Sequence, residues 1–303
     1  MALPSQTLSS TDALLDQNMK IESQWWIAWR RFRRHRLALV GVVVLLILYL
    51  TALFAPVLAP YSPTKIFMGH ALAPPSARFP LGTDSVGRDE LSRLLYAGRI
   101  SLTVGLVAAG VALSIGVFMG IMAGFYGRWV DMVIMRFIDM MLAIPSLFLL
   151  LIVSTLLRPS IYNIMIIIGL TSWMEVARLV RGQILSERTR EYVDAARAMG
   201  MNDFRIMLRH LLPNAIAPVI VAGTLMVARA ILTESALSFL GLGVQPPIAS
   251  WGSMLSTAQN YIWGSPMLVV YPGVLILITT LSINLIGDGL RDALDPRRLL
   301  RRS

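Results

Sequence analysis

The chain contains 303 residues, of which 56% are hydrophobic and only 15% are charged. Soluble domains average about 25% charged residues, so this composition excludes an ordinary soluble fold and indicates that the protein places apolar surface in lipid. Lys and Arg number 27 against 17 for Asp and Glu, which gives a formal net charge of +10. There is no Cys, which excludes disulfide frameworks, thiolate nucleophiles and iron–sulfur centres, and the three His are too far apart along the chain to predict a metal site.

Six stretches are candidate membrane spans. A hydrocarbon core of about 30 Å needs about 20 apolar residues in a helix. Windows free or nearly free of charge occur at residues 37–64, 100–127, 140–157, 159–174, about 214–228 and about 267–287. We therefore expect an all-α membrane protein with about six transmembrane helices. Residues 37–99 would hold the first helix and an external loop, and residues 100–287 a five-helix core. The second window is rich in Gly, Ala and Ser, which predicts close packing against other helices.

Residues 235–265 are also uncharged, but Gly and Pro residues divide them into pieces too short to span. Irregular backbone cannot face lipid, so we expect a re-entrant or external segment packed against protein. The first span follows a leader of 36 residues and is longer than the core of a signal peptide, which favours an uncleaved anchor.

The basic residues predict the orientation. With six crossings, 20 Lys and Arg residues fall on the side of the N-terminus, six on the other side, and Arg229 within a helix. Because cytoplasmic loops are enriched in Lys and Arg, both termini are expected in the cytoplasm, as an N-terminal segment with an Arg cluster (residues 1–36) and a tail (residues 288–303). A topology signal of this kind disfavours nucleic-acid binding as the role of the basic residues.

The longest predicted cytoplasmic loop, residues 178–213, has the pattern of two amphipathic helices around a turn. Tyr192, Ala195, Ala196 and Met199 recur at helical spacing and would form one face. The small alanines would let a partner surface approach the backbone closely. From the pattern alone, the loop could equally lie on the membrane surface or pack on its own helices.

Gly200 is the expected end of the first loop helix, because Gly enters the left-handed cap conformation without a steric penalty. Asn202 or Asp203 can cap the second helix, and Phe204 begins its apolar spacing. We expect this helix to end at Pro213, which lacks the N–H that regular hydrogen bonding requires.

This loop resembles the EAA loop of ATP-binding-cassette (ABC) importer permeases. The similarity lies in Asp-Ala-Ala at residues 194–196, Gly200, and Leu-Pro at residues 212–213. The chain has Asp194 where the consensus has Glu, and His210 where it has Ile. Segments 81–89, 237–243 and 287–297 resemble recurrent segments of one branch, the C-type permeases of dipeptide, oligopeptide and nickel importers.

The resemblance implies a fold like that of type I ABC importer permeases, and a heterodimer with a second homologous permease. It also implies two cytoplasmic ATPase subunits, an external substrate-binding protein and contact with membrane lipid, but no nucleic acid and no cofactor. The implied ATPase-coupling residues are Glu191, Asp194, Ala195, Ala196, Met199, Gly200 and Phe204. Dipeptides, oligopeptides, nickel chelates, glutathione and other small solutes remain open as cargo.

The residues also argue against a self-sufficient transporter or enzyme. Neither Lys lies in a G-x-x-x-x-G-K-[ST] context, so any ATP must be hydrolysed by another subunit. No nucleophile and base pattern emerges, and we expect no catalytic residue. The alternative, a stand-alone ion-coupled transporter or channel, would be expected to carry carboxylates or His at bilayer depth, and the clearest spans contain almost none.

A few polar residues near the later spans are candidates for a pathway or gate: Arg229, Glu234 and Asn284. Arg229 and Glu234 lie about 140° apart on a helix, so they are not expected to pair. Structural alternatives exist for each, including snorkelling of Arg229 and a hydrogen bond from Asn284 to another helix. Glu175 is expected to be interfacial and structural. Asp84 and Asp89 occur in Gly-x-Asp elements, which favour turns and helix caps over catalysis.

Overall fold

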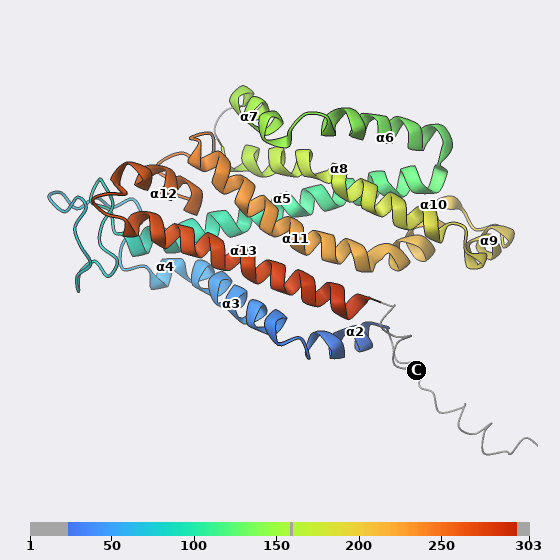
Figure 1. The fold of residues 1–303 in the computed structure, drawn as a ribbon, viewed down its shortest axis with the longest axis horizontal. Coiled ribbons are helices and arrows are strands. Elements are labelled where there is room, and N and C mark those ends of the chain that lie inside the picture. Colours follow the sequence, from blue (N-terminus) through green and yellow to red (C-terminus); the bar gives the residue numbers. More distant parts are fainter. Residues whose placement is uncertain (1–23, 158–159, 296–303) are drawn as a thin grey trace, which may run out of the picture.

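The structure, a computed structural model, describes residues 24–157 and 160–295, and these ranges contain helices and no strand. The longest helices lie side by side along one axis (Figure 1). Parts of the predicted N-terminal segment and tail, residues 1–23 and 296–303, lie outside the described residues. The elements are α2 (Gln24–Phe32), α3 (Arg36–Leu53), α4 (Ala55–Leu58), α5 (Glu90–Tyr126), α6 (Arg128–Leu142), α7 (Ser146–Leu156), α8 (Ile161–Glu187), α9 (Glu191–Ala198), α10 (Asp203–Ile206), the π-helix η1 (Met207–Leu211), α11 (Leu212–Phe239), α12 (Trp251–Ala258), the 3₁₀-helix η2 (Gln259–Tyr261) and α13 (Met267–Leu294).

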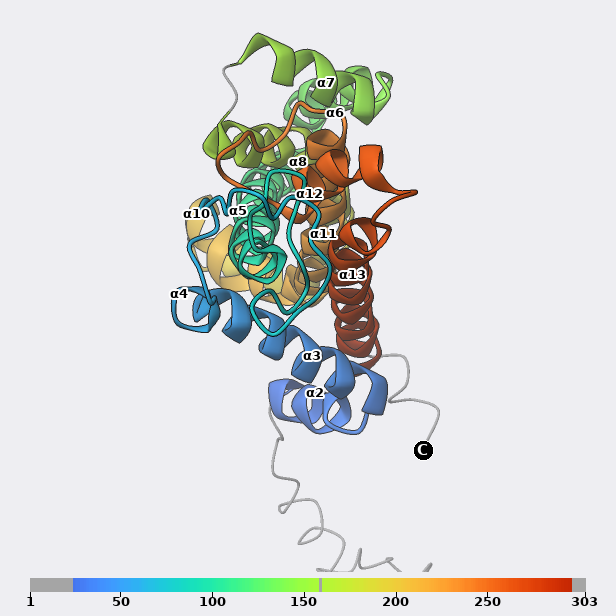
Figure 2. The same cartoon turned by 90° about the vertical axis from the view of Figure 1, so that its left-hand side faces the viewer.

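The described residues contain five helices long and apolar enough to cross a membrane, or six if the bent pair α6 and α7 forms one span. The prediction of an all-α membrane protein with about six spans is confirmed. The described part of the segment before α5 and the turn around α12 gather at one end of the bundle, which faces the viewer in Figure 2, whereas α9 and α10 lie at the other end (Figure 1).

The third predicted span, residues 140–157, is wrong as a single straight helix. It combines the end of α6 with α7, and these two helices are bent by 86°. Pro145 lies at the break, where it provides no N–H donor and disfavours helical backbone at the residue before it. α6 is held against α8 by Arg181, whose Nη2 donates to Oδ2 of Asp131 over 2.6 Å.

Two helix boundaries also differ from the predicted windows. α5 begins at Glu90 rather than near residue 100, because Asp89 caps it and its first turns are charged. At about 1.5 Å per residue, α5 is about 55 Å long and exceeds the thickness of the hydrocarbon core. α11 continues to Phe239, so Arg229 and Glu234 lie inside this helix.

The most extensive helix contact among the described residues joins α5 to α8. Gly116 and Gly120 are one turn apart on α5 and face Val176 and Val180 on α8. A Cβ at Gly116 would lie 2.5 Å from Cβ of Val176, and one at Gly120 would lie 2.6 Å from Cβ of Val180. The glycines therefore form a groove that receives a ridge of β-branched side chains, as the composition of the second window predicts.

α3 lies outside this core and packs on α13. A Cβ at Gly41 of α3 would lie 2.7 Å from the carbonyl oxygen of Ser282, and a Cβ at Gly289 of α13 would lie 2.4 Å from Cβ of Ala38. The other side of α3 exposes Leu and Val side chains such as Leu39, which is typical of a helix facing lipid.

The α5–α8 contact predicts that Gly120→Ala lowers stability by about 1–3 kcal/mol, because the new methyl overpacks a contact that has no room. Gly110→Ala is the matched control on the same helix, since a Cβ there meets nothing within 4 Å. Thermal unfolding of the purified protein in detergent measures both. Equal midpoints for the two variants would contradict the described packing.

Candidate functional site

α9 and α10 form a compact helix–turn–helix, here called the knob (Glu191–Ile206), at one end of the bundle (Figure 1). Gly200 has φ +74 and follows α9. The N–H of Gly200 donates to the carbonyl of Arg197 over 2.9 Å, and the N–H of Met201 donates to that of Ala196 over 3.1 Å. These two bonds define a Schellman cap, so the prediction that Gly200 ends the helix is confirmed.

The second helix of the knob begins at Asp203, and Asn202 is its cap. The Asn202 side-chain oxygen accepts a hydrogen bond from the N–H of Arg205 over 2.9 Å. The sequence left Asn202 and Asp203 open as caps, and the geometry selects Asn202. The two caps fix the turn between the helices through backbone conformation and local hydrogen bonds.

The predicted apolar face of α9 is only partly correct. Val193 and Ala196 are the residues it buries, within the same hydrophobic cluster as Ile206 and Leu211. Met199, expected on that face, is 75% exposed. Met199 is the C-cap residue, one position beyond the end of α9. The helical spacing therefore does not determine the direction of its side chain.

Most of the predicted coupling residues share the outer surface of the knob. Phe204 on α10 is 66% exposed, so the knob presents apolar side chains from both of its helices to the outside. Ala196 is the exception, since it is buried underneath. The exposed members are Glu191, Asp194, Ala195, Met199, Gly200 and Phe204.

The knob is attached to the ends of three long helices. The Tyr192 hydroxyl donates to Oε2 of Glu187 at the end of α8 over 2.9 Å and accepts from Nδ2 of Asn214 in α11 over 3.1 Å. Burial, together with the bond to Glu187, raises the pKa of Tyr192. Next to Glu187, Arg188 donates to the carbonyl of Gly124 at the end of α5 over 3.0 Å. Displacement of α9 would therefore be transmitted to α5, α8 and α11.

The prediction that Pro213 ends the second loop helix is wrong. α10 continues through the π-helix η1 into α11, and Pro213 lies in the first turn of α11. Pro is tolerated there because it lies in the first turn of α11, directly after the wider turn of the π-helix. As a result, the knob is continuous with a membrane-spanning helix.

Arg229 on α11 forms an ion pair with Glu175 on α8, in which Nη1 of Arg229 donates to Oε2 of Glu175. The two side chains are 68% and 61% exposed. They border a cavity of about 150 Å³ between the two helices, whose other lining residues are Val176, Leu179, Ala222, Leu225 and Met226. The sequence singled out Arg229 but missed its partner. In the predicted windows, Glu175 directly follows residues 159–174 and Arg229 directly follows residues 214–228, so the sequence pattern contained no signal that the two side chains meet.

Glu234 does not line an open path in this structure, because it is fully buried. Its carboxylate accepts hydrogen bonds from Oγ of Ser238 over 2.6 Å and from Oγ of Ser101 over 3.4 Å. Those hydroxyls in turn accept from the N–H of Val244 and of Trp251, both over 3.1 Å. Glu234 is thus a structural anchor that holds the turn after α11 against α5, and it does not pair with Arg229, as expected.

Asn284 is exposed on α13. Its expected hydrogen bond to another helix is absent, since its side chain makes none with the described part of the chain. Any partner of Asn284 therefore lies outside the helices described here.

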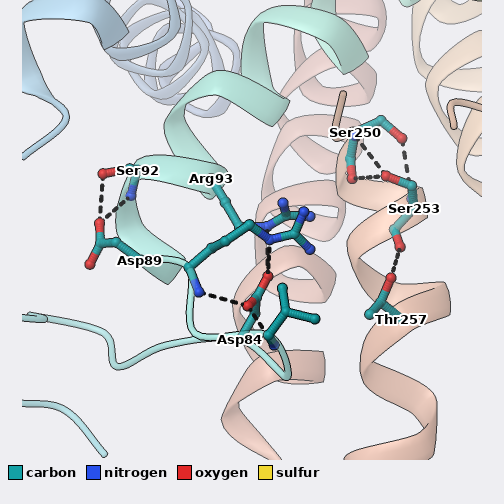
Figure 3. A network of polar contacts seen from close by, with 9 residues as sticks. Asp84, Asp89, Ser92, Arg93, Ser250, Ser253 and Thr257 are labelled. Carbon is teal, nitrogen blue, oxygen red and sulfur yellow. Dashed lines mark hydrogen bonds and ion pairs between the residues drawn. The ribbon is translucent and has the colours of Figure 1, made fainter. Parts of the chain in front are cut away.

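The segment between α11 and α13 packs against protein, as predicted from its broken pattern. Ser250 and Ser253 form a capping box at the start of α12 (Figure 3). The indole N–H of Trp251 donates to the carbonyl of Leu94 on α5 over 3.2 Å. Gly252 lies so close to α11 that a Cβ there would be 2.5 Å from Cα of Ser235.

Asp84 and Asp89 organise the turn that precedes α5 (Figure 3). Asp84 accepts from the N–H and the Nε of Arg88, over 2.8 and 2.7 Å, and forms an ion pair with Arg93 at 3.3 Å. Asp89 accepts from the N–H of Ser92 over 2.8 Å and caps α5. The structural interpretation of these carboxylates is confirmed. Within residues 24–157 and 160–295, no group of three or more acidic or His side chains could hold a metal ion.

Comparison with known families gives the class. Residues 116–300 match the family described as "Binding-protein-dependent transport system inner membrane component". Residues 23–75 match the "N-terminal TM domain of oligopeptide transport permease C". The chain belongs to the family of binding-protein-dependent inner membrane components, and is a multi-pass inner membrane permease of the ABC transporter class.

Individual relatives are similar over most of the chain. The dipeptide transport system permease protein DppC of Alkalihalophilus pseudofirmus is 43% identical over 275 residues, which cover 91% of this chain and 90% of the relative. The di/tripeptide transport system permease protein DppC of Pseudomonas aeruginosa is 45% identical over 275 residues, covering 89% and 91%. A chain of the MetNI methionine ABC transporter, in an inward-facing crystal form, has a TM-score of 0.55 at 18% identity. That match covers 68% of this chain and 97% of the MetNI chain, and it confirms the predicted fold.

The buried position of Glu234 predicts that Glu234→Leu destabilises the turn after α11 by about 1–3 kcal/mol, because two serine hydroxyls lose their acceptor inside the protein. Glu234→Gln should retain most of the stability, since its amide oxygen can still accept. Thermal unfolding, with limited proteolysis of the segment between α11 and α12, measures the effect. A Leu variant as stable and as protected as the Gln variant would contradict the anchoring role.

Proposed function

We propose that this chain is one of two homologous membrane subunits of an ATP-driven importer of short peptides. Its partners would be a second permease, two cytoplasmic ATPase subunits that perform all nucleotide hydrolysis, and an external substrate-binding protein. Both termini would be cytoplasmic. Peptides are favoured as cargo because several of the similar permeases are named for dipeptide, di/tripeptide or oligopeptide transport.

The observation that supports this mechanism most directly is the knob. It exposes the apolar side chains of Met199 and Phe204 at the cytoplasmic end implied by the basic residues, and it is attached to α8 and α11. Exposed apolar side chains beside the charged Glu191 and Asp194 are suited to binding a protein surface. An ATPase dimer that closes on ATP would displace the knob.

That displacement would change the tilt of the helices on both sides of the loop. α8 leads into the knob and α11 leaves it, the latter without an interruption. Because buried packing transmits displacement rather than absorbing it, motion of the knob would move both helices relative to the second permease. The central path would then open alternately to the two sides of the membrane, and the binding protein would deliver peptide from outside.

The Schellman cap predicts that Gly200→Val uncouples ATP hydrolysis from uptake. A β-branched residue at φ +74 costs about 1–2 kcal/mol and would force the turn between α9 and α10 into another conformation. Apart from Gly200 and its two chain neighbours, no residue has a heavy atom within 4 Å of a Cβ at this position, so the effect would arise from the backbone and not from a clash. Uptake of a radiolabelled dipeptide should fall at least about tenfold, while the chain stays in the membrane.

Gly200→Asn is the matched control, because Asn tolerates the left-handed conformation, and it should retain most of the uptake. Wild-type uptake by the Val variant would contradict the role of the knob. The function itself is tested by purifying the chain with its partners into liposomes that contain ATP. Copurification of ATPase subunits and ATP-dependent dipeptide uptake support the proposal, whereas uptake driven by an ion gradient through this chain alone would refute it.

A further inference from the structure

Glu175 and Arg229 lie in the interiors of two helices that are long and apolar enough to cross a membrane. Glu175 is about 20 Å from each end of α8 along the helix axis, and Arg229 is about 15 Å from the outer end of α11. Charged side chains at this depth avoid lipid and face protein or a water-filled cavity. Since both side chains are more than half exposed in this chain, the face that bears them is covered by something other than lipid.

The ion pair leaves hydrogen-bonding groups of both residues unused. Among the described residues, the two charged groups are joined by one hydrogen bond, from Nη1 of Arg229 to Oε2 of Glu175, and neither has another partner. Nε and Nη2 of Arg229 and Oε1 of Glu175 therefore remain for a ligand. A guanidinium with two such donors can hold a carboxylate in a bidentate manner.

The adjoining cavity of about 150 Å³ combines these charges with an apolar wall, to which Val176, Leu179 and Met226 contribute. A short peptide presents the complementary groups. Its terminal carboxylate and ammonium are both largely ionised at neutral pH, and its side chains vary. Two opposite charges can leave water only if each finds a partner.

We propose that Glu175 and Arg229 form a transient binding site for the charged ends of a peptide on the translocation path. Arg229 receives the terminal carboxylate, Glu175 receives the terminal ammonium, and the apolar wall accepts a side chain. The peptide thus forms two ion pairs through the groups that the bond between Arg229 and Glu175 leaves unused, and neither of its terminal charges is left unpaired. This inference rests on the proposed function, since it requires that the cargo is a peptide.

The site is tested with the complete transporter in liposomes, supplied with its binding protein and ATP. The probe is a dipeptide of alanine and a diazirine-bearing leucine, which forms covalent bonds to its neighbours on irradiation during turnover. Mass spectrometry should find the label on α8 and α11 at the cavity, at Val176, Leu179 or Met226. Arg229→Gln should reduce this labelling at least about tenfold, because a charge-assisted hydrogen bond to the carboxylate is lost.

Arg178→Gln is the matched control. Arg178 lies one turn from Glu175 on α8 and pairs with Asp139 on α6 over 2.5 Å, so this variant also breaks an exposed ion pair between helices. Labelling of the Arg178→Gln variant at the cavity should equal that of the wild type. If loss of any ion pair between helices reduced labelling by loosening the bundle, this variant would also lose label. Glu175→Gln provides a second test if the Arg229 variant does not assemble with the ATPases. It should lower the labelling because the terminal ammonium of the peptide loses its ion pair with Glu175.

The outcomes separate the two proposals. Dipeptide uptake without label at the cavity, or labelling that Arg229→Gln leaves unchanged, overturns the site and leaves the proposed function intact. No ATP-dependent uptake of the dipeptide by the wild-type complex refutes the proposed function, and the site with it.

Discussion

The close contact between α5 and α8 is the constraint on which the rest of the structure depends. Gly116, Gly120 and Gly124 follow one another at intervals of one turn and leave room for Val176, Val180 and Ile184 of α8. Without side chains on the glycines, the two backbones approach closely enough for dispersion forces to hold the helices together where lipid provides no hydrophobic driving force. α8 thereby acquires a fixed path from the opposite end of the bundle to the knob.

The knob receives its position from this contact. Arg188, just beyond α8, donates to a carbonyl at the end of α5, and Tyr192 joins α8 to α11. The polar groups at the opposite end have a different task, because Glu234 and Asp84 fix turns inside the protein. The chain therefore combines a firmly held end, where α12 and the turn before α5 lie, with an exposed knob at the opposite end of the bundle. Between them, Glu175 on α8 and Arg229 on α11 form an exposed ion pair, to which we assign the charged ends of the cargo.

Much of this could be predicted from the sequence, for reasons that are local. Length and hydropathy determine the spans, and the left-handed position at Gly200 is visible because Gly serves it best. The 86° bend between α6 and α7 was missed because one window contained both sides of Pro145. The π-helix before Pro213 and the pairing of Glu175 with Arg229 depend on tertiary packing, which a linear pattern does not contain. The burial of Glu234 likewise depends on two serines, Ser101 and Ser238, of which Ser101 is brought to it only by the fold.

The central claim is that the exposed surface of the knob lies in the cytoplasm and receives force from the ATPase subunits. The absence of Cys permits a direct measurement, since Ala195→Cys introduces one thiol on that surface without background labelling. In intact cells, a membrane-impermeant maleimide should not modify this thiol. Once the membrane is permeabilised the thiol should react, and bound ATPase subunits should slow that reaction. Full labelling from outside intact cells would contradict the orientation and, with it, the proposed transmission of force.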